Sequence, residues 1–293
     1  ITGGFGNFGT ILCHQLSNKF NVIRTSYTFN NHQTISGCIN ETLDISNRKM
    51  CQSVISKYKP DIIINCAALT NVDLCENNHK KAHLINVEGV RNLVQCLNSK
   101  SKIIHISTDY VFDGDTKECY LENAPTFPIN YYGKTKLEAE NLLRGSNVNY
   151  AIIRSSMLFG EQLSSKSNFF SWVYDSLIKR TEINVINNTY SNPAWMDQLC
   201  EVILQIIILN SNGIFHFGSA DKLSRYEFAN SIADVFDLDA QLINSVNIKE
   251  LSFIAKRPKN SSLSIDKTMN ELGVSPYTIE HCLCKMKESA IIV

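Results

Sequence analysis

The sequence predicts an α/β fold, a doubly wound parallel sheet with a smaller C-terminal lobe. Short β-branched runs alternate with longer stretches of helical period along much of the chain. Two of these runs, Ile62-Ile63-Ile64 and Ile103-Ile104, are apolar at consecutive positions, which is typical of strands buried on both faces. Strands that alternate with helices are typical of a parallel sheet covered by helices on each side.

Each expected element has a place in this alternation. The expected strands are Val22–Thr25, Asp61–Cys66, Lys102–Thr108, Tyr150–Ser155, Glu182–Ile186 and Gly213–Gly218. The expected helices are Phe8–Lys19, Asn47–Lys57, Lys80–Leu97, Tyr132–Arg144, Ser167–Lys179 and Asp197–Leu209. Residues 27–43 are polar and are expected to form a loop.

The regular alternation decays after about residue 156. The segments 157–168, 187–196 and 252–264 are irregular, polar and contain Asn, Ser or Pro. We therefore expect a first domain over residues 1–156, to which 182–212 returns, and a smaller lobe over residues 157–293.

Composition and charge exclude two classes of partner. Of the 293 residues, 44% are hydrophobic and 19% charged, the mix of a soluble globular protein. Lys plus Arg and Asp plus Glu number 28 each, so no positive excess is available for nucleic acid or an anionic membrane surface. The most apolar run, Val202–Leu209, is interrupted by Gln205 and is too short to span a bilayer.

The ten cysteines show no Cys-x-x-Cys pair and no regular spacing. This pattern predicts reduced, mostly buried thiols and therefore a cytoplasmic protein. No signal peptide is visible, and a few native residues are expected before Ile1 because the chain does not open with Met. The seven histidines have no metal-ligand spacing, so we expect no metal and interpret them as solvated or capping residues.

The glycine-rich turn Thr2-Gly3-Gly4-Phe5-Gly6-Asn7-Phe8-Gly9 precedes the first helix. Glycines spaced by three let the backbone turn tightly and approach a pyrophosphate, which rests on the amides at the start of the helix. Although such a turn is weak evidence by itself, its position in an alternating chain raises its value. The first domain is therefore predicted to be an NAD(P)-binding Rossmann domain.

The second strand indicates which dinucleotide binds. An acidic residue at its end would hold the ribose hydroxyls of NAD and repel the phosphate of NADP. This strand ends Arg24-Thr25-Ser26, with a cation and hydroxyls but no acid. The sequence thus favours NADPH, while NAD stays open.

Tyr132 and Lys136 form the only Tyr-x-x-x-Lys match in the chain. Eleven tyrosines would give roughly one such match by chance, so the spacing alone says little. On a helix the two side chains share one face, and the ammonium is expected to lower the pKa of the phenol. A surface helix is the alternative, but the strand that ends in Ser107-Thr108 would add a hydroxyl to the same pocket and favours a site.

Four motifs together resemble the extended short-chain dehydrogenase/reductase family: Gly3-x-x-Gly6-x-x-Gly9, Asn65-Cys66-Ala67-Ala68, Tyr132-x-x-x-Lys136 and Arg154-Ser155-Ser156. Three more resemble its dTDP-4-dehydrorhamnose reductase branch: Ser107-Thr108-Asp109-Tyr110-Val111-Phe112-Asp113-Gly114, Tyr132-Gly133-Lys134-Thr135-Lys136-Leu137-Glu138 and Arg257-Pro258-Lys259-Asn260-Ser261. The resemblance runs nearly end to end.

The resemblance implies a role for each matching position. Thr108 would bind the substrate carbonyl, Tyr132 would donate the proton, and Lys136 would hold the nicotinamide ribose and tune Tyr132. Besides Arg24, Tyr132 and Lys136, the implied cofactor residues are Gly3, Gly6, Asn7, Phe8 and Gly9 at the pyrophosphate, Asp44 and Ile45 at the adenine, Ala67 and Ala68 at the nicotinamide, and the helix asparagine Asn86. The implied substrate residues are Leu69, Thr108, Tyr110, Met157, Arg257 and Asn260.

The chain departs from related patterns at three positions. Dehydratases of this fold carry Asp-Glu after the Thr, whereas here Thr108 is followed by Asp109-Tyr110, which favours carbonyl reduction over loss of water. Met157 and Leu69 stand where the resembled reductases commonly have aromatic residues, so the sugar is left open.

The sequence therefore predicts an NADPH-dependent reductase of the 4-keto group of a nucleotide-linked 6-deoxy sugar. The nucleotide sugar is the expected partner, and a homodimer is compatible with this interpretation. Two alternatives stay open: a non-catalytic NADP-binding regulatory subunit and an NAD-dependent sugar-nucleotide epimerase.

Overall fold

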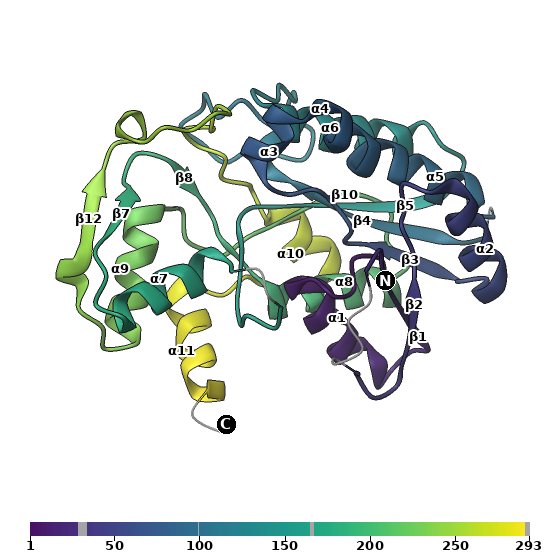
Figure 1. Ribbon diagram of the computed structural model, residues 1–293, viewed down its shortest axis with the longest axis horizontal. Helices are drawn as coiled ribbons and strands as arrows, with labels where there is room; N and C mark the ends of the chain where they lie inside the picture. Colours follow the sequence, from purple (N-terminus) through teal and green to yellow (C-terminus); the bar gives the residue numbers. More distant parts are fainter. Residues whose placement is uncertain (29–33, 99, 165–166, 291–293) are drawn as a thin grey trace.

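The computed structural model describes residues 1–28, 34–98, 100–164 and 167–290 (Figure 1). Four parallel strands form its main sheet, in the order β10 (Gly213–Phe217), β5 (Asn149–Ser155), β4 (Lys102–Thr108) and β3 (Ile62–Asn65). A second parallel pair consists of β1 (Val22–Ser26) and β2 (Cys38–Thr42).

The first residues of the chain join the two sheets. Thr2 bridges Asn65 in parallel, and the Gly4 amide donates to the Thr25 carbonyl at 2.9 Å. The strands therefore follow one another as β2, β1, residues 1–4, β3, β4, β5 and β10. This is the order of a dinucleotide-binding doubly wound sheet, whose ligand crevice lies where the order reverses.

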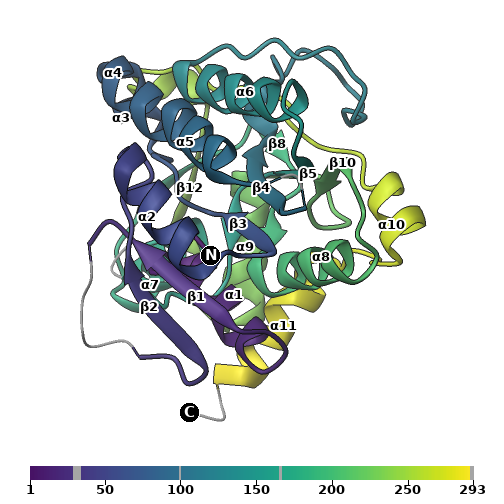
Figure 2. The same cartoon turned by 90° about the vertical axis from the view of Figure 1, so that its right-hand side faces the viewer.

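Helices cover both faces of this sheet (Figure 2). On one face α1 (Asn7–Ser17) and α8 (Met196–Ile208) pack in a core that includes Ile64 and Ile104. On the other face α2 (Arg48–Tyr58), α5 (Gly89–Cys96) and α6 (Tyr131–Arg144) pack in a core that includes Ile63 and Ile103. Successive isoleucines thus enter opposite cores, as the consecutive apolar runs predicted. The predicted α/β fold with a parallel sheet is confirmed.

The segment expected to be a loop contains a strand. Residues 38–42 form β2, which among the described residues pairs with β1 alone, at the edge of the sheet. Its side chains are half-buried or exposed, and Asn40, Glu41 and Thr42 give it no apolar signal. An edge strand can be built from such residues because its stability comes from backbone pairing on one side. Residues 29–33 of the expected loop lie outside the described residues.

The expected helix Lys80–Leu97 is interrupted. It consists of α4 (His79–His83), a π-helical turn over Leu84–Glu88, and α5. A further short helix, α3 (Val72–Asn77), precedes it. Single π-turns inside helices occur frequently at functional sites, and this one contains Asn86.

A second lobe lies at the left of Figure 1. There β7 (Ile183–Ile186) and β12 (Ile243–Val246) pair in parallel. The helices α7 (Phe169–Ile178), α9 (Arg225–Val235) and α11 (Ile279–Ala290) share a core that includes Phe170, Phe228 and Leu283. The segment 182–212 is therefore split: β7 belongs to this core, whereas α8 returns to the first one.

Shorter elements complete the chain. They are β6 (Leu158–Phe159) paired with β9 (Ala194–Trp195), β8 (Tyr190–Ser191) paired with β11 (Leu223–Ser224), α10 (Asp266–Leu272), and 3-10 turns at Asp109–Val111, Ala240–Leu242 and Ile248–Glu250. Over the described residues, no helix has the length and apolar character that a membrane crossing requires.

The interior holds two histidines that we interpreted as solvated or capping. His105 in β4 and His216 in β10 are 1% and 0% exposed, so that interpretation was wrong for both. Each is hydrogen-bonded inside the protein, which offsets the cost of burying its ring nitrogens. All ten cysteines are free thiols; five are buried, three are half-buried and two are exposed, so the expectation of mostly buried thiols holds for only half of them.

Candidate active site

The glycine-rich turn leaves no room for side chains. Gly3 has a φ of +63°, and a Cβ atom there would lie 2.8 Å from the Ala67 amide nitrogen. A Cβ atom on Gly9 would lie 2.3 Å from the Gly3 carbonyl oxygen. Gly6, the N-cap of α1, gives the first turn no side-chain hydrogen bond. The turn thus brings bare backbone to a helix start that attracts anions, which fits the pyrophosphate of a dinucleotide.

Arg24 lies beneath this turn and is fully buried. Its Nε donates to the Gly4 carbonyl at 2.8 Å, and a terminal nitrogen donates to Thr10 Oγ1 at 2.9 Å. The Phe5 ring covers the guanidinium, 3.7 Å from its central carbon. In this arrangement Arg24 supports the turn from within. Its contact with the 2′-phosphate of NADP stays a prediction.

Tyr132 and Thr108 meet at the carboxyl end of the sheet. Asn130 caps α6 by accepting from the Gly133 amide at 2.8 Å, which places Tyr132 in the first turn. A Cβ atom on Gly133 would lie 2.1 Å from the Tyr110 carbonyl oxygen, so only glycine lets α6 approach this closely. Thr108 is the last residue of β4, and its side chain is hydrogen-bonded to Tyr132. The structure therefore brings together the two residues that the sequence placed at one pocket.

The hydrogen bonds of Thr108 fix the direction of this contact. Its hydroxyl donates to Asp109 Oδ1 at 2.9 Å and accepts from the Tyr110 amide at 3.2 Å. The contact with Thr108 lowers the pKa of Tyr132, which only a hydrogen bond donated to the phenolate does, so Thr108 is the donor and its hydrogen turns from Asp109 to Tyr132 when the phenolate forms. Asp109 is in turn bound by the Ser261 hydroxyl. Asp109 and Ser261 thus hold the Thr108 hydroxyl beside Tyr132.

The expected lowering of the pKa of Tyr132 was wrong for this structure. Burial raises its pKa, and the hydrogen bond from Thr108 only partly opposes the rise. The reason is that desolvation of a phenolate outweighs the favourable contacts. The phenol therefore keeps its proton at neutral pH, as an acid in a reduction must.

Lys136 lies one helical turn after Tyr132 and is 2% exposed. Its ammonium donates to the Ile106 carbonyl at 2.6 Å and lies 3.1 Å from His105 Nε2. Burial lowers its pKa to about 8, an effect that the carboxylate of Glu140 opposes. Lys136 is therefore still mostly charged at neutral pH.

Asn86 clamps the loop that follows β3. Its oxygen accepts from the Leu69 amide at 2.7 Å, and its nitrogen donates to the Leu69 carbonyl at 3.1 Å and to Thr135 Oγ1 at 3.0 Å. With its amide hydrogens and oxygen engaged, Asn86 positions Leu69 beside α6. A direct contact of Asn86 with the cofactor stays a prediction.

Of the other implied cofactor residues, Ala67 is joined to the glycine-rich turn, since its amide donates to Thr2 Oγ1 at 3.3 Å. Asp44 accepts from the amide and hydroxyl of Ser46 through one oxygen. Ile45 is buried against Gly89 of α5. The roles of these residues, and of Ala68, Asn7 and Phe8, toward a cofactor stay predictions.

The implied substrate residues fall into two groups. Tyr110 faces Tyr132 edge to ring, with centroids 6.1 Å apart, and its hydroxyl is bound by Arg225 at the start of α9. Met157 packs against the core of the second lobe. These two lie where the two lobes meet, as expected for a substrate site.

Arg257 and Asn260 are engaged inside the protein instead. Arg257 forms an ion pair with Asp73 of α3 at 2.8 Å. Asn260 is 5% exposed and donates to the carbonyls of Thr116 and Glu118 at 2.9 and 3.0 Å. Its oxygen accepts from the Ser262 amide at 3.2 Å. Asn260 therefore holds the 114–118 loop, and its contact with a substrate stays a prediction.

Sequence reasoning missed several polar residues around the site. Asp109 orients Thr108, and the fully buried carboxylate of Glu140 binds Arg154 at 2.7 Å behind Lys136. His105 interrupts the apolar run of β4. A polar residue inside an otherwise apolar buried strand requires a partner, and this signal was available in the sequence.

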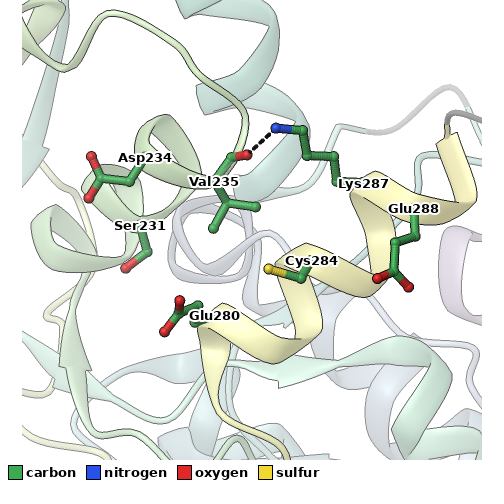
Figure 3. Close-up of a pocket in the computed structure, with 7 residues that line it drawn as sticks. All are labelled: Ser231, Asp234, Val235, Glu280, Cys284, Lys287 and Glu288. Atoms are coloured by element: carbon green, nitrogen blue, oxygen red, sulfur yellow. Dashed lines mark hydrogen bonds between the residues drawn. The ribbon is translucent and has the colours of Figure 1, made fainter.

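A hollow lies elsewhere, between α9 and α11 (Figure 3). It is lined by Ser231, Asp234, Val235, Glu280, Cys284, Lys287 and Glu288. The Lys287 ammonium donates to the Val235 carbonyl at 2.7 Å and fixes α11 to α9. None of the predicted site residues lines this hollow, so it is separate from the candidate active site.

The family model for the RmlD substrate binding domain matches residues 1–290. The chain belongs to this family. It is 31% identical to a dTDP-4-dehydrorhamnose reductase of Aggregatibacter actinomycetemcomitans, over 99% of this chain and 98% of the relative.

Solved structures of the family agree. A dTDP-4-dehydrorhamnose reductase of Clostridium acetobutylicum superposes with a TM-score of 0.85 at 29% identity, covering 99% of this chain and 98% of the other. One of Bacillus anthracis, solved in complex with NADP, superposes with a TM-score of 0.84 at 28% identity, over 98% and 97% of the two chains.

Proposed function

We propose that this chain is an NADPH-dependent reductase of the 4-keto group of a nucleotide-linked 6-deoxy sugar, of the dTDP-4-dehydrorhamnose reductase type. The observation that supports it most is the contact between Tyr132 and Thr108, with Lys136 one turn away. Members of the RmlD substrate binding domain family are named for this reaction, and one was solved with NADP. NADPH, when bound, supplies the hydride.

Residues of the chain bind the 4-keto oxygen and supply the proton that it takes up. The 4-keto oxygen accepts the hydrogen of the Tyr132 hydroxyl. The Thr108 hydroxyl then turns about one dihedral angle, from Asp109 toward the same oxygen. As hydride reaches C4, the oxygen becomes an alkoxide and the Tyr132 hydroxyl donates its proton there. The charge of Lys136 stabilises the phenolate that remains.

Site chemistry disfavours a dehydratase and a regulatory subunit, and cofactor retention distinguishes an epimerase. Tyr110 occupies the position of the dehydratase Glu, and a phenol of raised pKa cannot act as the carboxylate base of an elimination. A non-catalytic NADP-binding regulatory subunit would have no need of the hydrogen-bonded set of Asp109, Thr108 and Tyr132. An NAD-dependent epimerase would retain tightly bound cofactor through purification.

We further propose the organisation around this reaction. The Rossmann domain comprises residues 1–156 together with α8 and β10, and the rest of 157–293 forms the substrate lobe. The protein acts in the cytoplasm on a nucleotide-sugar substrate, and it forms a homodimer.

The proposal is tested by following NADPH absorbance with a panel of 4-keto-6-deoxy sugar nucleotides. Consumption of NADPH with formation of the 4-hydroxy sugar supports it. Binding of NADPH without turnover of any sugar of the panel would indicate a regulatory subunit instead.

A further inference from the structure

Four buried polar side chains form a row beneath the active site: Thr2, Asn65 at the end of β3, His105 in β4 and Lys136 on α6. They are 3%, 1%, 1% and 2% exposed. Thr2 bridges Asn65, and Asn65 stands opposite His105 in the register of β3 and β4. The row therefore crosses three neighbouring strands of the sheet and ends on the catalytic helix.

Each neighbour in the row is within hydrogen-bond distance of the next. Thr2 Oγ1 lies 2.5 Å from Asn65 Oδ1, and Asn65 Nδ2 lies 3.0 Å from His105 Nδ1. His105 Nε2 lies 3.1 Å from Lys136 Nζ. Thr2 also accepts from the Ala67 amide. The row thus connects the glycine-rich turn, the loop after β3 and the active-site lysine.

We propose that His105 is a positioning residue for the reduction: its Nε2 accepts a hydrogen bond from the Lys136 ammonium and fixes that charge one helical turn after Tyr132. This inference rests on the proposed function. Among the described residues, the contacts of the Lys136 ammonium are the Ile106 carbonyl and His105. Because the Ile106 contact is made by the backbone, His105 is the side chain whose substitution can change the position of the Lys136 charge.

The number of hydrogens on each group determines which tautomer of His105 is present and how the Asn65 amide is oriented. An ammonium can only donate, so His105 Nε2 must accept from it, and the single hydrogen of the neutral ring is then on Nδ1. This Nδ1–H requires an acceptor, which Asn65 provides when a half turn of its amide presents the oxygen to His105. If Lys136 loses its proton, the pattern reverses: His105 Nε2–H donates to the amine and Asn65 Nδ2 donates to Nδ1. The tautomer of His105 thus reports the charge of Lys136.

The neighbouring charges are compatible with this assignment. Glu140, one turn further along α6, and the Cys66 thiol after β3 act on the Lys136 charge. Glu140 is neutralised by Arg154. Burial and the Lys136 charge lower the pKa of His105 well below its ordinary value, so its ring stays neutral and can accept.

The experiment compares His105→Leu with His105→Gln, whose side-chain oxygen can take the place of Nε2. We expect His105→Leu to lower kcat by about ten- to a hundredfold, the range that a hydrogen bond to a charged group is worth. We also expect the alkaline limb of the kcat/KM profile to move about one unit lower, because the ammonium loses an acceptor. His105→Gln should restore both, and NADPH affinity should change less than kcat. Ile103→Val, a buried change in β4 away from the row, controls for strand stability.

A second measurement keeps the inference testable if His105→Leu does not fold. In the wild type with 15N-labelled histidine, assigned by comparison with His105→Gln, we expect a neutral Nδ1–H ring at pH 7 and an Nε2–H ring near pH 9.5. An Nε2–H ring at pH 7, or normal kcat and pH profile in His105→Leu, would overturn the role of His105. Failure of the wild type to reduce any sugar would refute the proposed function instead, and the tautomer measurement does not depend on that result.

Discussion

Replacing Asp109 by Asn is expected to stabilise the protein at neutral pH. Burial raises the pKa of Asp109 from its ordinary value of 3.8 to about 6. A carboxyl group whose pKa is higher in the folded state disfavours folding when it is ionised. This cost is absent below the unfolded pKa, grows as the pH rises toward 6, and is constant above it.

The magnitude follows from the two pKa values. At pH 8 the ionised carboxylate costs about 3 kcal/mol, and at pH 5 it costs about half as much. Asn removes the charge and keeps the shape: its oxygen can accept from Thr108, while its NH2 donates to the Ser261 hydroxyl. The free energy of unfolding of the variant should therefore exceed that of the wild type by about 3 kcal/mol at pH 8, and by about half as much at pH 5.

Urea unfolding of both proteins at pH 5 and pH 8 measures the two differences. Asp115→Asn makes the same chemical change at an exposed side chain and should alter stability by less than about 0.5 kcal/mol at either pH. Equal stabilisation by Asp109→Asn at the two pH values would refute the reasoning, because a pH-independent effect comes from packing rather than from charge.

Four further outcomes are expected. Tyr132→Phe should bind NADPH with unchanged affinity by fluorescence titration and lose about a hundred- to ten-thousandfold in kcat, because the transferable proton is gone; near-normal turnover would remove Tyr132 from the mechanism. The kcat/KM value should be higher with NADPH than with NADH, and the opposite order would show that nothing near Arg24 reads the 2′-phosphate. Met157→Trp should gain roughly two- to tenfold in affinity for dTDP-4-dehydrorhamnose, while the wild type accepts a broader set of 4-keto sugars; a wild type specific for that sugar alone, with no gain in the variant, would contradict this. Arg154→Met should lose about 3–5 kcal/mol in urea unfolding, because it leaves Glu140 charged and unpaired in the core, and Glu140→Leu in the same chain should recover most of the loss.

The sequence by itself determined the layers of the first domain. The strand Lys102–Thr108 has the bounds that its apolar run predicted, since a strand covered on both faces must be apolar at consecutive positions. The turn of Gly3, Gly6 and Gly9 was equally visible, because close backbone approach at Gly3 and Gly9 leaves no room for a Cβ atom. The apolar strand and the glycine-rich turn can be predicted from local sequence because each depends on residues that are adjacent in the chain.

Tertiary structure alone decided which polar groups are available to a ligand. Asn260 matches a motif of the resembled branch, yet its amide is used up by carbonyls 142 and 144 residues away. The pKa of Tyr132 rises rather than falls because desolvation depends on everything packed around the phenol and not on the lysine four residues later. The row from Thr2 to Lys136 joins residues far apart in the chain, and only the order of the strands brings them together. Hydrogen-bond partners and burial are properties of the assembled chain, which is why a motif could name these residues without giving their partners.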